Sequence, residues 1–171
     1  GFASDAARDR VVLFGGWTGA YQGDTWEWNG TGWTEKSPVS SPAAREYAGM
    51  VYEAARGRVL LFGGSNGTHF NDTWTWDGTA WRQLSPTSAP SGRVTFGMAY
   101  DAARDRVVLF GGNASGQLLN DTWEWNGTSW LQQFPATAPP ARDGSLMVYD
   151  ATLGRVVLFG FAEGQELTEH T

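Results

Sequence analysis

The sequence predicts an all-β fold made of repeated four-stranded sheets, and three observations support this prediction. The 171 residues are 41% hydrophobic, which is enough for a sizeable buried core. The chain contains 10 Trp and 23 Gly, so large aromatic side chains alternate with frequent tight turns. Phe-Gly-Gly begins at residues 14, 62 and 110, and a degenerate Phe-Gly-Phe begins at 159, so a unit of 48 or 49 residues recurs.

Other sequence markers keep the same period. Asp-Thr-Trp begins at residues 24, 72 and 121, a single Trp follows at 33, 81 and 130, and an Arg recurs at 45, 93 and 142. Hydrophobic runs separated by turn signals predict four strands in each unit. In the third unit the predicted strands are Arg93–Tyr100, Arg106–Phe110, Asp121–Trp125 and Ser129–Gln132. The Asn-Gly pair at 126–127 suits the tight turn between the last two.

A sheet of four strands cannot bury both of its faces by itself, so we expect the sheets to stack radially as the blades of a β-propeller. Trp26 and Trp28 lie two residues apart and therefore point to the same side of one strand. We interpret these Trp residues and their copies as packing surfaces between blades, in preference to a platform for a ligand.

These motifs together resemble the kelch repeat. They are an Arg-led first strand, a hydrophobic strand that ends in Gly-Gly, an Asn-Asp-x-Trp third strand and a spaced Trp. The resemblance covers nearly the whole chain and is nearest to bacterial kelch proteins that are distantly similar to the central domain of galactose oxidase. It implies a kelch-type β-propeller with four-stranded antiparallel blades, in a family that commonly closes rings of six or seven.

The repeat markers divide the chain into a partial blade 1–44, blades 45–92 and 93–141, and a partial blade 142–171. About three and a half blades do not close a ring, so the chain is either a segment of a larger protein or a unit that assembles with copies of itself. If the units carry three, four, four and three strands, two chains have the strand count of seven blades. The segment 162–171 lacks the Asp-Thr-Trp marker, and either 166–169 forms a weak third strand or this segment is a foreign or truncated end.

Candidate binding residues lie in the loops, because positions that differ between the repeats are free to carry function. The loops between second and third strands and those that lead into the next blade should emerge on one face. Exposed aromatic residues there suit stacking on sugars or anchoring a protein, although they could equally cover the blade tops. The candidate ligand-binding residues are Trp17, Tyr21, Glu46, Tyr47, His69, Phe70, Phe96, Leu118 and Asp143.

Residues that repeat without change favour structural roles instead. Arg45, Arg93 and Arg142 could line the central channel with positive charge, but their equivalence favours an interpretation in which each bridges loops or pairs with a neighbouring blade. We expect the repeated Asp of Asp-Thr-Trp to accept hydrogen bonds from backbone amides. Glu46 and Asp143 are more typical of solvated carboxylates than of a catalytic pair.

Composition and missing motifs narrow the functional classes. The net charge of −6, with Lys36 as the single Lys, gives no basic footprint for nucleic acid, and we find no apolar run long enough for a membrane helix. The absence of Cys and the presence of only two His argue against copper chemistry, and we expect no cofactor. The leading hypothesis is a non-catalytic module that binds a protein or carbohydrate. The alternative is part of a sugar oxidase or epimerase-like enzyme whose active site needs further blades.

Two further expectations concern the setting of the protein. A composition with little Lys and much Thr and Gly, together with the resemblance, favours an exported bacterial protein that is extracellular or periplasmic. Homodimerisation to complete a ring is the expectation that follows from open blade faces.

Overall fold

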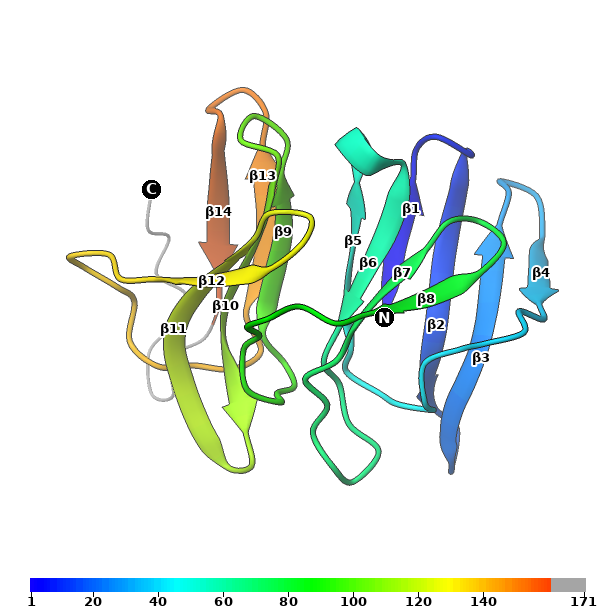
Figure 1. Ribbon diagram of the computed structural model, residues 1–171, viewed down its shortest axis with the longest axis horizontal. Coiled ribbons are helices and arrows are strands. Elements are labelled where there is room, and N and C mark those ends of the chain that lie inside the picture. Colours follow the sequence, from blue (N-terminus) through cyan, green and yellow to red (C-terminus); the bar gives the residue numbers. More distant parts are fainter. Residues whose placement is uncertain (161–171) are drawn as a thin grey trace.

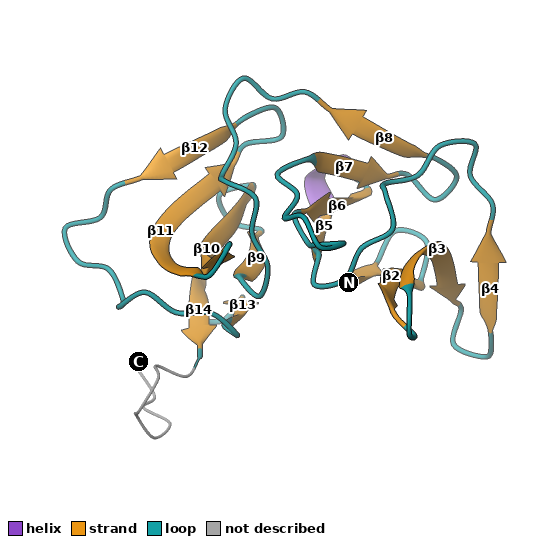
Figure 2. Ribbon diagram, turned by 90° about the horizontal axis from the view of Figure 1, so that it is seen from below, coloured by secondary structure: helices purple, strands orange, loops and turns teal. Residues whose placement is uncertain are grey.

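The computed structural model describes residues 1–160, which form four antiparallel sheets along an arc (Figures 1 and 2). We call these sheets blades 1 to 4. Blade 1 contains β1 (Phe2–Asp5), β2 (Arg10–Trp17), β3 (Tyr21–Trp28) and β4 (Trp33–Lys36). Blade 2 contains β5 (Gly49–Glu53), β6 (Arg58–Phe62), β7 (Thr73–Trp76) and β8 (Trp81–Leu84), with the 3-10 helix η1 (Ala54–Arg56) between β5 and β6. Blade 3 contains β9 (Gly97–Asp101), β10 (Arg106–Ala114), β11 (Gln117–Trp125) and β12 (Trp130–Gln133), and the described part of blade 4 contains β13 (Leu146–Asp150) and β14 (Arg155–Phe159).

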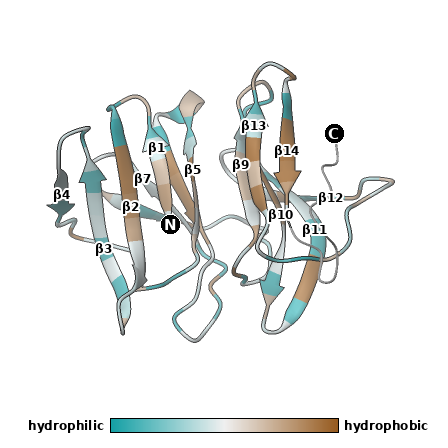
Figure 3. Cartoon of the chain, turned by 180° about the vertical axis from the view of Figure 1, so that it is seen from behind, coloured by the Kyte–Doolittle hydropathy of each residue, from teal (hydrophilic) through white to brown (hydrophobic). Residues whose placement is uncertain are grey.

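The strands of each complete blade pair in chain order and run from the inside of the arc to its rim. β1 contacts β5, β5 contacts β9, and β9 contacts β13, so the first strands of successive blades lie next to one another. Figure 2 shows β4, β8 and β12 along the outer edge. The second strands are the most apolar, as the brown colour of β2 and β14 in Figure 3 shows. This arrangement is that of a partial β-propeller with four-stranded antiparallel blades, as predicted.

Two expectations about the strands are wrong. Phe2–Asp5 pairs with β2, so the first unit has four strands where we expected three. The described strands are therefore distributed as four, four, four and two, which gives the same total of fourteen strands for each chain. The first strand of blade 3 begins at Gly97 and not at Arg93, because Thr95 has a φ of +54°, which no regular strand accommodates. The expected strand at 166–169 lies outside the described residues.

At the Gly-Gly motif β6 ends, while β2 and β10 continue past it with a shift in register, because the backbone there turns into the left-handed region against the next blade. The first glycine of the motif has a φ of +62° to +69° in blades 1 to 3. A Cβ on Gly63 would lie 2.9 Å from the carbonyl oxygen of Arg93, and one on Gly111 would lie 2.8 Å from that of Arg142. Glycine is thus required both by the dihedral angle and by the close approach of the next blade.

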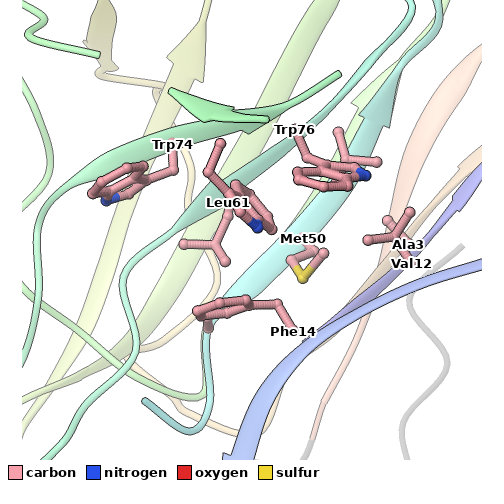
Figure 4. Packing of buried hydrophobic residues seen from close by; sticks show 10 residues of the cluster. Ala3, Val12, Phe14, Met50, Leu61, Trp74 and Trp76 are labelled. Carbon is pink, nitrogen blue, oxygen red and sulfur yellow. The ribbon is translucent and has the colours of Figure 1, made fainter. Parts of the chain in front are cut away.

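Tryptophans fill the interfaces between blades, as predicted. One apolar cluster joins blades 1 and 2 around Phe14 and Trp76, and its members are drawn in Figure 4. A second cluster joins blades 2 and 3 around Phe62 and Trp130. Each fully buried ring removes a large apolar area from water, which is the main source of stability for stacked sheets.

The indole N–H groups of the four most deeply buried interface tryptophans point back to the preceding blade. Trp76 Nε1 donates to Glu27 Oε1 at 3.1 Å, and Trp81 Nε1 donates to Thr25 Oγ1 at 2.9 Å. The next interface repeats the pattern with the hydrogen bonds Trp125 Nε1 to Glu53 Oε1 and Trp130 Nε1 to Thr73 Oγ1, both 3.1 Å. Blade stacking therefore satisfies polar groups as well as burying apolar ones.

No helix within residues 1–160 is long and apolar enough to span a membrane.

Candidate interaction face

Two sets of loops share one edge of the arc, at the bottom of Figure 1, as predicted. The first set joins second to third strands, and the second set leads from each fourth strand to the next blade. Backbone hydrogen bonds tie the two sets together: Gly16 N–H donates to Arg45 O at 2.9 Å, and Gly64 N–H donates to Arg93 O at 3.0 Å. We call this edge the loop face; it comprises residues 17–23, 46–48, 65–71, 94–96, 113–120 and 143–145.

The repeated arginines hold the loop face together from beneath. Arg93 Nη1 and Nη2 bind the two carboxylate oxygens of Asp121 at 2.6 and 2.8 Å, and the same guanidinium donates to Gly111 O at 2.9 Å. Arg45 binds Asp72 in the same way. Both arginines are buried, so they bridge loops of their own blade, which confirms the structural interpretation, and they do not line the channel with free charge.

At the buried pair of Arg93 and Asp121, the surroundings favour the ionised form of the Asp121 carboxylate. Burial by itself raises the pKa of Asp121, but the hydrogen bonds from Arg93 and from the indole of Trp123, together with the Arg93 charge, more than offset it and hold the pKa below its ordinary value. The indole nitrogens of Trp26 and Trp74 likewise donate to the Asp two residues earlier. The repeated Asp thus receives side-chain donors, where we expected backbone amides to be its main partners.

Two of the predicted binding residues belong to the scaffold. Phe70 lies against the buried Arg45, with the guanidinium carbon 3.9 Å from the centroid of its ring. Phe96 is only 8% exposed and packs edge-on against Phe62, with the ring centroids 5.8 Å apart. The expectation of an accessible Phe96 at the mouth of the channel is therefore wrong, because the Gly-Gly turn of blade 2 opens the space that its ring fills.

Three other predicted residues occupy one equivalent position, once per blade, where the chain returns from the second strand to the third. They are Tyr21 at the start of β3, His69 in the loop between β6 and β7, and Leu118 near the start of β11. The Tyr21 hydroxyl lies beside Gly67 of the next blade, and His69 Nδ1 accepts the N–H of Ser115 at 2.9 Å. Each loop thus rests on the loop of the following blade, and the loop face is continuous across blades 1 to 3.

The most accessible aromatic residues on the loop face are Trp17 and Tyr47. Trp17 is 54% exposed and contacts Tyr21 edge-on with a centroid distance of 4.7 Å. Tyr47 is 59% exposed and has a φ of +56°, which non-glycine residues seldom adopt. Thr95 and Gly144 have positive φ at the same position of blades 3 and 4, so this conformation belongs to the connection itself.

The two carboxylates predicted at the channel mouth stand on different blades. Glu46 is in blade 2 and Asp143 is in blade 4, and Val94 occupies the same position of the blade between them. The described residues therefore bring no pair of carboxylates together there, and none of their His, Cys, Asp and Glu form a group of three that could hold a metal ion.

A shallow polar groove of about 580 Å³ lies between the loops of blades 2 and 3. His69 lines it together with Thr68, Ser91 and Ser115. The three hydroxyl residues were not predicted from the sequence, since Ser and Thr in variable loops carry no distinguishing pattern. These hydroxyl residues are identified by the contact between His69 and the loop of the next blade, and that contact can be seen only in the folded structure.

A comparison with protein-family models matches residues 1–170 to the KLHDC2/KLHL20/DRC7 Kelch-repeats domain. A comparison with curated proteins finds no match. The match spans the three complete blades and the described strands of the fourth. The chain belongs to the kelch-repeat family.

Proposed function

We propose that this chain is a non-catalytic module that binds a protein partner through its loop face. Kelch repeats generally act as protein-interaction modules, which supports a binding role. The observation that carries the assignment of the surface is the exposure of Trp17 and Tyr47 on loops that are fixed to one another and to buried arginines. Rigid, exposed aromatic residues are the usual anchors of protein interfaces.

The charge of the loop face indicates the kind of partner. Its residues include the carboxylates of Glu46 and Asp143 and no Lys or Arg. Arg45 and Arg93 beneath it are neutralised by Asp72 and Asp121. We therefore expect a neutral or basic segment whose apolar side chains contact Trp17 and Tyr47 and whose cationic groups approach the carboxylates.

Peptide selection followed by variant binding tests this proposal. A peptide library displayed on phage is selected on the protein, and the enriched peptides are measured against Trp17→Ala and Tyr47→Ala. Each change should weaken binding about tenfold or more, as for an aromatic hot spot. Leu131→Ala is the matched control, because Leu131 is 49% exposed on β12 at the outer rim, away from the loop face.

The outcomes of this experiment distinguish a protein partner from a carbohydrate ligand. If the selected peptides bind both loop-face variants as well as they bind the wild type, the loop face is not the interaction surface. If no peptide is enriched and a glycan array gives binding that Trp17→Ala abolishes, the same surface recognises sugars and the protein-binding proposal is wrong. Thermal unfolding of each variant checks that the loss is not a loss of fold.

A further inference from the structure

An open niche lies in blade 1 at the edge opposite the loop face. It has a volume of about 240 Å³ and lies where the β1–β2 turn meets the β3–β4 turn. Its lining includes Asp5, Asp9, Trp28, Asn29 and Gly30. The loop-face residues are not part of it.

The same position in blade 3 is filled by an arginine from the preceding blade. Arg56 binds both carboxylate oxygens of Asp105, at 2.5 and 2.8 Å, and donates to the carbonyl oxygen of Asn126 at 3.0 Å. Its guanidinium lies against the Cα of Gly127, where a Cβ would collide with it. This ion pair holds the pKa of Asp105 below its ordinary value.

Blade 2 shows a second occupied example. Arg8 of blade 1 donates to the carbonyl oxygen of Gly57 at 2.9 Å, and its guanidinium lies where a Cβ on Gly78 would be. Gly57 occupies in blade 2 the position of Asp105 in blade 3. The guanidinium therefore enters the niche in both blades, whether a carbonyl or a carboxylate receives it.

Blade 1 has the receiving groups of blade 3. Asp9 occupies the position of Asp105, and the two residues have φ values of +53° and +52°. Asn29 and Gly30 occupy the positions of Asn126 and Gly127, and the glycines have φ values of +93° and +99°. The backbone that shapes the occupied niche is thus present in the open one.

A buried acceptor in this niche is unfilled. The Asp5 side chain is fully buried; its Oδ2 accepts from Arg8 Nη1 at 2.7 Å, while its Oδ1 has no hydrogen-bond partner among the described residues. In blade 3 the corresponding Oδ1 of Asp101 accepts two backbone N–H groups. The donors in blade 3 belong to the turn itself and not to Arg56, so we assign the arginine to the positions of Asp105 and Asn126 and not to this oxygen.

We propose that the niche binds the guanidinium of an arginine on a further blade that stacks on blade 1, as Arg8 enters blade 2 and Arg56 enters blade 3. Asp9 receives the two parallel N–H groups, the carbonyl of Asn29 receives a third, and Gly30 leaves room for the planar group. Lysine fits poorly, because a single ammonium cannot bind both carboxylate oxygens and the carbonyl in this geometry. The face of Trp28 beside the niche supplies apolar contact for the arginine stem.

The sequence of blade 4 argues against a second copy of this chain as the source of the arginine. A copy placed so that its blade 4 precedes blade 1 would bring Leu153 to the position from which Arg8 and Arg56 reach their neighbours. Arg104, the matching arginine of blade 3, already binds Asp101 and Glu124 of its own blade. We therefore assign the arginine to a blade whose sequence differs from that of blade 4.

Nuclear magnetic resonance on the whole chain tests the site directly. The protein is titrated with N-acetyl-arginine methylamide at millimolar concentrations, and the backbone amides of Asp9 and Gly30 and the indole of Trp28 are followed. The lysine analogue is the ligand control. Asp9→Asn should bind the arginine analogue about tenfold more weakly, because the charge-assisted fork is lost, while Asn still tolerates the positive φ.

A matched variant and a dilution series complete the test. Glu35→Gln removes one carboxylate from an exposed position of the same blade and should leave arginine binding unchanged. Equal binding of the lysine analogue, or unchanged binding in Asp9→Asn, overturns the proposal. If the Trp28 indole signal shifts on concentrating the protein alone, and Arg104→Gln removes that shift, a second copy supplies the arginine and our assignment of its source is wrong.

Discussion

Replacing Arg93 by Met should unfold the protein at a markedly lower urea concentration. Arg93 is fully buried and makes five hydrogen bonds, two of them to Asp121 and three to Ser91 and Gly111. Met fills much of the space but provides no donor. The Asp121 carboxylate, which is 19% exposed, then loses its only ion-pair partner among the described residues.

The expected loss of stability follows from the free-energy cost of leaving one charge of a buried ion pair without its partner. Removing one partner of such an ion pair costs about 3–5 kcal/mol, and a domain of this kind has a total stability of roughly 5–15 kcal/mol. We therefore expect Arg93→Met to remove about a third or more of the free energy of unfolding. The double variant Arg93→Met with Asp121→Leu should recover much of this loss, because no unpaired charge remains.

Urea unfolding followed by tryptophan fluorescence measures both effects. The control is Arg82→Met, because Arg82 is 72% exposed and lies 3.6 Å from Asp77, and exposed pairs contribute about 0–1 kcal/mol. If Arg93→Met costs no more than Arg82→Met, the buried Arg-Asp bridge does not hold the loop face together. If the double variant is less stable than Arg93→Met, the loss does not come from the orphaned charge.

Three further outcomes follow from the structure. Thr73→Val should cost about 1–3 kcal/mol in urea unfolding, because it leaves the buried indole N–H of Trp130 without an acceptor; a change below the error of the measurement would show that this bond is not needed. Gly63→Ala should cost about 1–3 kcal/mol through its positive φ and the nearby carbonyl of Arg93, and an unchanged unfolding midpoint would contradict this. Because the folded pKa of Asp121 is lowered, its contribution is present above the unfolded value of about 3.9 and is lost as the pH falls through the folded pKa, so Asp121→Asn should flatten the acid branch of a stability profile; parallel profiles would refute that.

The repeat period predicted the architecture because a propeller blade is a local structure. Phe-Gly-Gly, Asp-Thr-Trp and the spaced Trp lie in one unit of sequence and specify one sheet each. The first strand of blade 1 was missed because Phe2–Asp5 is preceded by no Arg and is short. Pairing with β2 establishes it as a strand, and that pairing depends on the turn at 6–9.

The candidate site was predicted less completely, because exposure depends on contacts between blades. Trp17 and Tyr47 are accessible as predicted, whereas Phe70 and Phe96 are held by Arg45 and Phe62. All four aromatics lie in loops of variable sequence, and no local pattern separates the two pairs. The equivalence of Arg8 and Arg56 was visible in the repeat, but their entry into the next blade appears only when the sheets are stacked.

The indole hydrogen bonds give blade stacking a direction. Each interface joins donors on one side of a blade to acceptors on the other, so two identical sides placed against each other would set donor against donor. Blades within this chain therefore stack head to tail, and a face-to-face pairing of blades is disfavoured even where its apolar area is large. For the same reason, a further blade that stacks on this arc must present the matching hydrogen-bond donors or acceptors as well as a complementary shape.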